Sequence, residues 1–395
     1  MNNTFYKKYT QQILFGLLIT FYLFIFYIYS LEQCYPRIGF AGVYGICIGI
    51  GFLFAGLFLK EDFKRLEKNN ILKPLKNKIS INNRNERISL IFNYLFIFFI
   101  GYQTAYVLDG HYGDLVDNPA NVIFSLHLSN FKLLYIVEGI LLTIFSIIIS
   151  NKKDEKNERS KLIFPHELIF NFAIAAGIGG ILGAKLLFVF TEPGDFFEKL
   201  FSTSGLTFYG GLIGGATSVI LYAKKLKLPI LKIADCFAPI LMLAYSIGRM
   251  GCQLAGDGCW GIKNEHSHSI LPDWIWKNEY IGAIHGQPLD ELNKFYISVF
   301  PTPIYETIIC FICFLFLWFI RKKIKIAGML FSIYLMLNGI ERFFIEKIRV
   351  NPSISDSIQF TQAQVVGIIL FMIGLIGALY LIKRKNDTKR SIKKI

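Results

Sequence analysis

The sequence lacks a recognisable metal-binding framework. It has seven cysteines and six histidines, and the single CxxC pair, Cys310 and Cys313, lies inside an apolar run with no second pair or histidine beside it. Thiols in such a run are expected to pack between helices as small apolar residues. We therefore predict no metal site and no other cofactor.

No cleavable signal peptide is expected either. Lys7 and Lys8 precede the first apolar run, but this run is longer than a signal-peptide core, and no small-residue cleavage site follows it. Glu32 and Gln33 stand before Cys34, where a lipoprotein cleavage box needs small residues. We expect the first run to remain as a membrane anchor.

Acidic residues are fewer than basic ones, 28 against 42, which gives a net charge of +14. The basic residues are unevenly placed: segment 60–87 holds nine Lys or Arg, whereas segment 109–130 has three Asp and no Lys or Arg. This is the positive-inside pattern of membrane proteins, and it predicts that both termini are cytoplasmic. Basic clusters beginning at Arg321 and Lys383 are topology signals that also suit anionic lipid headgroups. No nucleic-acid partner is expected.

Long apolar runs dominate the chain, which is 53% hydrophobic and 16% aromatic with a mean hydropathy of +0.46. A membrane-spanning helix needs about 20 such residues, and ten runs approach that length. The predicted spans are 11–30, 39–59, 88–108, 131–150, 167–190, 205–223, 230–250, 303–320, 326–346 and 364–383. The predicted fold class is an all-α polytopic membrane protein with about ten transmembrane helices.

The largest predicted external segment, 251–302, separates the seventh and eighth spans. It contains Trp260, Trp274 and Trp276, side chains that suit the membrane–water boundary. Its length is sufficient for a small folded head on the external membrane surface.

Two of the predicted spans are dense in glycine, at Gly177–Gly183 and at Gly210–Gly215. Small residues allow membrane helices to approach closely. Alternatively, the missing side chains leave room for a lipid beside Tyr209.

Residues Gly248–Gly261 read GRMGCQLAGDGCWG and follow an apolar run directly. An arginine costs roughly 2.5–3.5 kcal/mol at the centre of a membrane helix on insertion scales. Arg249 therefore either extends to the interface or meets an anionic group. Cys252 and Cys259 either form a disulfide or remain thiols.

A second group of charges ends the ninth predicted span. Arg342, Glu346 and Arg349 are four and three residues apart, so they share one helical face. They form either a structural salt bridge or, with one positive charge in excess, a site for a phosphodiester. Glu306 is expected near the external face as an acid, a base or an arginine partner. Tyr44 is either a packing residue or part of the site.

Four ordered segments resemble the prolipoprotein diacylglyceryl transferase family of bacterial membrane enzymes. They are Phe208–Gly211, Ala234–Pro239 leading into Gly248–Gly251, Pro301–Glu306, and Arg342–Glu346 with Arg349. Tyr44 and Gly45 add a further match. The resemblance covers about two-thirds of the chain, and the order of the motifs is more specific than any one of them.

The resemblance implies transfer of a diacylglyceryl group from phosphatidylglycerol to the lipobox cysteine of prolipoprotein signal peptides, within the bacterial cytoplasmic (inner) membrane and near its external face. The implied catalytic residues are Arg249, Arg342, Glu346, Tyr209 and Asp257. The implied substrate-binding residues are Tyr44, Gly210, Gly211, Gln253, Glu306 and Arg349.

In this scheme Arg249 and Arg342 clamp the phosphate. Glu346 and Asp257 orient the arginines or receive a proton, and Tyr209 accepts the thiol proton or passes it on. Tyr44 and the two glycines shape the lipid slot.

The sequence departs from the family in four places. The family commonly has histidine at the position of Tyr209, Asn-Phe at Cys252 and Gln253, and glutamate at the position of Asp257. Three spans exceed the usual seven, which predicts added N-terminal helices within 1–166 and a transferase-like core in 167–395.

A transporter for an anionic solute or lipid is the alternative function, because glycine-rich helices and membrane arginines serve transporters equally well. The charged residues, however, gather near one predicted face rather than at the membrane midplane, which favours an enzyme. A purely structural membrane protein has little need for Arg342, Glu346 and Arg349 together.

Overall fold

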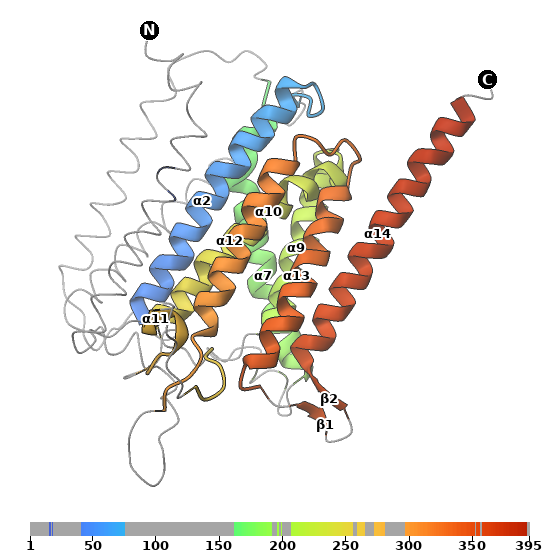
Figure 1. Ribbon diagram of the computed structural model, residues 1–395. Helices are drawn as coiled ribbons and strands as arrows, with labels where there is room; N and C mark the ends of the chain where they lie inside the picture. Colours follow the sequence, from blue (N-terminus) through green and yellow to red (C-terminus); the bar gives the residue numbers. More distant parts are fainter. Residues whose placement is uncertain are drawn as a thin grey trace, which may run out of the picture. The chain divides into compact units, whose positions relative to one another are not determined.

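The computed structural model describes 41–75, 162–191, 207–255, 259–264, 272–280, 297–351, 353–355 and 358–392, with Gly16, Leu18, Phe196 and Lys199. Within these residues the protein is mostly helical (Figure 1). The predicted third and fourth spans and almost all of the first lie outside the described residues.

The chain divides into two compact units. One comprises Met1–Leu72 together with Ile220–Ile395, and the other comprises Lys73–Val219. The predicted division between 1–166 and 167–395 stays a prediction.

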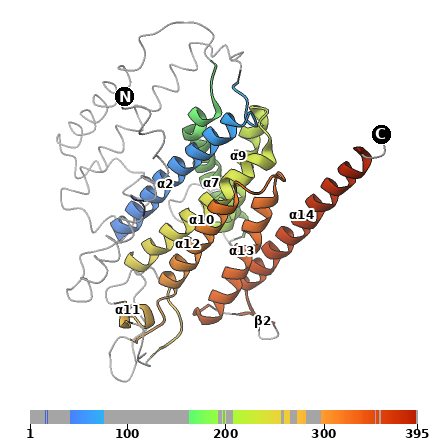
Figure 2. The ribbon, with the colours of Figure 1, turned by 45° about the horizontal axis from the view of Figure 1, so that its top comes forward.

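In the first unit, α10 (Ile230–Ala255) packs against both α2 (Ala41–Lys68) and α12 (Thr302–Ile320). The next helix, α13 (Met329–Ile345), packs against α10 and α12, and α14 (Gln362–Ile392) packs against α13. The helices run alongside one another and alternate in direction (Figures 1 and 2). One end of the bundle, called here the Glu306 end, therefore carries the end of α10, the start of α12 and the end of α13.

Four helices are long and apolar enough to cross a membrane. They are Pro165–Thr191, Ile230–Leu254, Thr302–Ile320 and Gln362–Asp387. They match the predicted fifth, seventh, eighth and tenth spans. Large apolar side chains such as Phe319 and Ile376 are exposed on them, as expected for helices surrounded by lipid. The total of ten spans stays a prediction.

Short elements connect the helices at the Glu306 end. The 3₁₀ helix η3 (Glu346–Ile348) continues α13 and leads to two antiparallel strands, β1 (Ser353–Ser355) and β2 (Ile358–Thr361). This hairpin is a small departure from the predicted all-α fold. The sequence contains β-branched residues there, which favour extended backbone.

The described parts of 251–302 also fold together. Trp260, Tyr280 and Val299 form a small buried cluster, and the Trp260 and Tyr280 rings lie 5.4 Å apart. The one-turn helix α11 (Asp273–Trp276) precedes Asn278, which pairs with Val299. The location of this segment outside the membrane remains a prediction.

At the other end of the bundle, a buried ion cluster joins α2 to the end of α12. The Asp62 carboxylate accepts hydrogen bonds from Arg65 Nε at 2.7 Å and from Arg321 Nε at 2.8 Å. The Arg321 guanidinium lies 3.3 Å from the centre of the Trp318 ring. Burial raises the pKa of Asp62, but the Arg65 hydrogen bond and the Arg321 charge outweigh it, so this pKa lies below its ordinary value.

The second unit contains the 3₁₀ helix η2 (Pro165–Leu168), α7 (Ile169–Thr191) and most of α9 (Phe208–Lys225). Glycines bring α7 and α9 into close contact: a Cβ atom on Gly183 would lie 2.8 Å from the Gly214 Cα atom. Such a separation is shorter than atoms tolerate, so this crossing requires glycine.

Candidate active site

The Glu306 carboxylate is the centre of the charged cluster at the Glu306 end. Pro301 and Pro303 fix the start of α12 because proline suits the first helical turn. This start places Glu306 inside the bundle, where its side chain is fully buried. A buried carboxylate needs charged or hydrogen-bonding partners, and the neighbouring helices supply them.

Arg249, in the last turns of α10, forms an ion pair through Nε with Glu306 Oε2. Tyr245 lies one turn earlier on α10, and its hydroxyl donates to the same oxygen at 3.3 Å. The Arg249 guanidinium also lies 5.3 Å from the centre of the Tyr245 ring. Arg249 therefore points into the bundle and does not merely extend to the interface. Sequence reasoning had not singled out Tyr245.

Arg342 and Arg349 reach the other oxygen of the same carboxylate. Arg342 Nη1 lies 3.7 Å from Glu306 Oε1, and Arg349 Nη1 donates to that oxygen at 3.1 Å. Glu346 Oε2 lies 3.4 Å from Arg342 Nη2 and 4.0 Å from Arg349 Nε. Arg342, Glu346 and Arg349 do lie close together, but not on the face of one helix as predicted, because α13 ends at Ile345 and the backbone of Arg349 is extended. Glu306 joins this group to Arg249.

The two cysteines beside Arg249 are not joined by a disulfide. Their sulfur atoms lie 3.9 Å (Cys252) and 3.3 Å (Cys259) from Arg249 Nη1. Thr302 anchors the loop between α10 and α12, because its hydroxyl donates to the Cys259 carbonyl oxygen at 2.6 Å. The Arg249 guanidinium thus has two thiol sulfur atoms beside Nη1, in addition to the Glu306 carboxylate at Nε.

The loop after α10 also fixes the chain at the end of η3, directly before Arg349. The Ile262 N–H donates to the Ile348 carbonyl at 2.8 Å, and Gly261 forms a bridge with Arg349. A Cβ atom on Gly261 would lie 2.6 Å from the Ile348 oxygen, so the approach requires glycine. Gln253 is held separately: the Tyr280 hydroxyl donates to its side-chain oxygen at 2.6 Å, with both groups buried.

Glu341 is a third buried carboxylate that sequence reasoning overlooked. It is 4% exposed, and neither of its carboxylate oxygens has a hydrogen-bond partner among the described residues. It interacts electrostatically with Glu306, and Tyr245 faces it. The sequence did contain an indication of it, because Glu341 is an acidic residue directly before Arg342 in a mostly apolar run.

The remaining predicted residues are not placed in this cluster. Tyr209, Gly210 and Gly211 belong to the second unit, where Tyr209 is half-buried. A Cβ atom on Gly210 would lie 2.7 Å from Leu187 Cβ, so at this glycine close helix packing is the role the structure supports. Asp257 lies outside the described residues, as does the side chain of Tyr44.

A family model described as prolipoprotein diacylglyceryl transferase matches residues 121–380. The chain belongs to this family.

Curated relatives agree with this assignment. A phosphatidylglycerol–prolipoprotein diacylglyceryl transferase from Clostridium tetani (strain Massachusetts / E88) is 33% identical over 236 residues, 58% of this chain and 85% of the relative. One from Clostridium perfringens (strain 13 / Type A) is 32% identical over 235 residues, 58% of this chain and 84% of the relative. One from Leptospira interrogans (serovar copenhageni) is 27% identical over 274 residues, 55% of this chain and 80% of the relative. These relatives do not favour a transporter.

In this member of the prolipoprotein diacylglyceryl transferase family, three arginines face two fully buried glutamates, Glu306 and Glu346. Among the described residues, Arg342 Nη1 and Arg349 Nε have no hydrogen-bond acceptor despite being buried. Guanidinium groups donate hydrogen bonds to phosphate oxygens through two adjacent nitrogens. The cluster can therefore donate further hydrogen bonds to a phosphate group.

Proposed function

We propose that this protein transfers the diacylglyceryl group of phosphatidylglycerol to the lipobox cysteine thiol of prolipoprotein signal peptides. The proposal rests on the membership of the family and on one structural observation: arginines from α10, α13 and the following turn converge on the single carboxylate of Glu306. We further propose that catalysis takes place near the external face of the bacterial inner membrane.

In the proposed reaction, the cysteine first loses its proton, because the thiolate is the nucleophile and an ordinary thiol has a pKa near 8.5. The sulfur then attacks the terminal carbon of the diacylglyceryl group, which is bonded to a phosphate oxygen. A carbon–sulfur bond forms, the carbon–oxygen bond to phosphate breaks, and glycerol phosphate leaves with the bonding electron pair. The products are a thioether and glycerol phosphate.

Arg249 and Arg342 would stabilise the charge that develops on the departing phosphate. Preorganised cations are most effective in a site with little water, and these guanidinium groups are mostly buried. Glu306 would hold both arginines in place before the lipid arrives. Arg349 and Glu346 would complete the frame, with Asp257 as a further orienting or proton-accepting group.

Two groups are candidates for the proton acceptor. Tyr209 occupies the position where the family commonly has histidine, and would accept the thiol proton or pass it on. Glu341 is the alternative, because its oxygens have no hydrogen-bond partner among the described residues. Tyr44, Gly210, Gly211 and Gln253 would bind or shape the path of the lipid.

Mass spectrometry of a lipobox peptide tests this function. The peptide is incubated with the purified protein and phosphatidylglycerol. A mass gain of one diacylglyceryl group on the cysteine, with release of glycerol phosphate, is the expected result. A peptide with serine in place of the cysteine is the control. Absence of modification by folded protein, while a relative modifies the same peptide, would contradict the proposal.

A further inference from the structure

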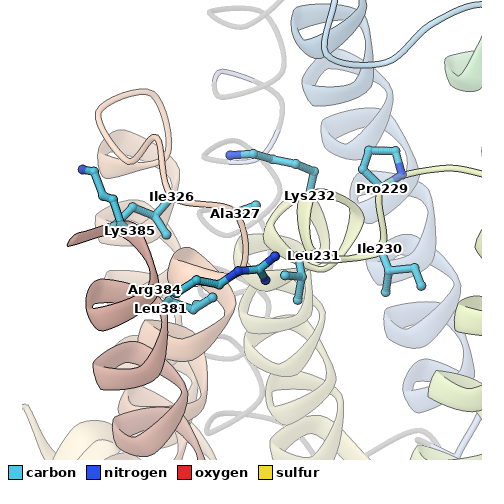
Figure 3. Close-up of a pocket in the computed structure, with 9 residues that line it drawn as sticks. All are labelled: Pro229, Ile230, Leu231, Lys232, Ile326, Ala327, Leu381, Arg384 and Lys385. Atoms are coloured by element: carbon cyan, nitrogen blue, oxygen red, sulfur yellow. The ribbon is translucent and has the colours of Figure 1, made fainter. Parts of the chain in front are cut away.

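A separate pocket lies at the end of the first unit opposite to Glu306. The start of α10, the connection between α12 and α13, and residues 381–385 of α14 border an open pocket with a volume of about 600 Å³ (Figure 3). Lys232 and Arg249 are 17 positions apart on α10, which corresponds to about 25 Å along the helix. The pocket is therefore distinct from the arginine cluster.

This pocket combines an apolar wall with a basic rim. Leu231, Ile326 and Leu381 contribute to the wall. The rim is formed by Lys232 of α10 with Arg384 and Lys385 of α14, and none of the described residues that line the pocket is acidic. Figure 3 shows the Arg384 side chain reaching from α14 towards Leu231 of α10. Such a lining suits a molecule with a hydrocarbon part and a negative group.

The positive charge continues into an adjacent pocket of about 510 Å³, which Lys232 also lines. Five basic and two acidic residues line this second pocket. Both carboxylates already have partners: Asp62 binds Arg321, and Asp235 accepts a hydrogen bond from the Gly328 N–H at 2.8 Å and lies 3.9 Å from Lys232 Nζ. The remaining basic residues of this pocket leave it with an excess of positive charge. Arg321 Nη2 is buried and has no acceptor among the described residues.

The path of α14 explains why the first pocket exists. This helix packs on α13, but it diverges from the other helices towards its C-terminal end (Figures 1 and 2). Lys232 on one side and Arg384 on the other thus face a shared space, with the α12–α13 connection between them. A ligand that binds both sides would hold the end of α14 to α10.

We propose that the first pocket binds one anionic phospholipid, with its acyl chains along the apolar wall and its headgroup phosphate between Lys232 and Arg384. Basic pockets between transmembrane helices bind anionic headgroups in this way. A free phosphate would leave the apolar wall unused. The basic start of a signal peptide would be repelled by the same cations.

Native mass spectrometry of the purified full-length chain tests this site. Phosphatidylserine is compared with phosphatidylcholine of identical acyl chains, because phosphatidylglycerol would also enter the proposed active site. We expect the wild-type protein to retain one phosphatidylserine at concentrations where it retains no phosphatidylcholine. The triple variant Lys232→Gln, Arg384→Gln, Lys385→Gln should bind phosphatidylserine roughly 100-fold more weakly, since each of the three cations contributes about fivefold.

A matched control removes the same charge elsewhere. Lys224, Lys225 and Lys227 are exposed and line neither pocket, so their replacement by glutamine should leave phosphatidylserine binding unchanged. Equal weakening in this control, or equal retention of the two lipids, would overturn the proposal. Displacement of the lipid by the same concentration of inorganic phosphate would also overturn it, because the site would then be a simple anion site.

A second variant tests the acyl part without changing charge. Leu381→Trp places a larger ring against the apolar wall, and we expect weaker phosphatidylserine binding. Wild-type binding by this variant would reject the acyl placement.

Thermal unfolding of every variant without added lipid checks that the folds are equivalent. None of these results depends on transferase activity, which can be present or absent independently.

Discussion

Arg249 of α10 and Arg342 of α13, which are 93 positions apart in the sequence, are held by opposite oxygens of one buried carboxylate, that of Glu306. This arrangement fixes two guanidinium groups before any substrate is present. Preorganised charge is effective because it needs no rearrangement during the reaction. Two kinds of experiment can therefore be distinguished. One replaces the arginines, and the other replaces Glu306, which positions them.

Replacing either arginine by lysine keeps the charge and removes the planar fork that binds two phosphate oxygens. We expect Arg249→Lys and Arg342→Lys each to lower kcat/KM for lipidation by roughly 10²–10³-fold. The peptide lipidation rate is the measurement. Lys224→Gln, at an exposed position outside the arginine cluster and both pockets, is the control and should retain the wild-type rate. Full activity in folded Arg249→Ala and Arg342→Ala variants would refute the phosphate clamp.

Replacing Glu306 tests its structural role. Glu306→Gln keeps the shape of the side chain but leaves three arginines without their shared charge, which we expect to lower the free energy of unfolding by about 3–5 kcal/mol. Thermal unfolding in detergent measures this change, and Glu306→Asp should lose less stability. As a control, Glu61→Gln breaks the more exposed pair with Lys64 and should cost under about 1 kcal/mol. Equal losses in the two variants would contradict a central role for Glu306.

The proton acceptor can be identified by comparing two variants. Tyr209→Phe and Glu341→Gln each remove one candidate while preserving shape. Loss of a general base typically costs about 10²–10⁴-fold in rate, so we expect one variant to lose kcat to this extent with little change in KM. The other should remain near wild type. Wild-type kcat in both variants would assign the proton to neither residue.

The sequence allowed the arginine cluster to be anticipated because its spacing is local. Arg342 and Glu346 are four residues apart and Arg349 follows three residues later, so the three stay close although α13 ends at Ile345. The alternation of spans brings Arg249 to the same end. The role of Glu306 as their common partner depends on how α12 is rotated against α10 and α13. Glu341 and Tyr245 were not predicted for the same reason, because a local sequence pattern does not indicate which polar side chain of a helix points into the bundle.

The sequence allowed two interpretations of the glycine-dense helices, close helix packing or space for a lipid. At Gly183 and Gly210 the structure favours packing, since the α7–α9 contacts leave no room for a Cβ atom. The hairpin of β1 and β2 was not anticipated, because two strands of three and four residues are too short to show a period-two pattern against the flanking apolar runs.

The helix crossing itself can be tested with two glycines of the same helix. Gly183→Ala adds a methyl group that would lie 2.8 Å from the Gly214 Cα atom, whereas the methyl group of Gly177→Ala would have no atom of the described residues within 4 Å. We expect Gly183→Ala to destabilise the protein by about 1–3 kcal/mol through overpacking, and Gly177→Ala to be neutral or slightly stabilising. Thermal unfolding of the two variants provides the measurement. Similar unfolding temperatures would contradict the close crossing.

The Asp62 cluster predicts a particular dependence of stability on pH. The pKa of Asp62 is lowered in the folded protein because hydrogen bonding to Arg65 and the charge of Arg321 outweigh burial, so folding favours the ionised carboxylate. Its contribution is therefore complete above the ordinary carboxyl pKa of about 3.9 and is lost as the pH falls through the lowered value. Asp62→Asn removes this titration.

We accordingly expect the stability difference between the wild-type protein and Asp62→Asn to be constant from about pH 8 to pH 5 and to shrink below about pH 4. Thermal unfolding in detergent across this range is the measurement. Glu61→Gln serves as the control, because the Glu61–Lys64 pair is more exposed and its difference should stay small at every pH. A difference at about pH 3 as large as that at about pH 7 would show that the charge of Asp62 is not what joins α2 to the end of α12.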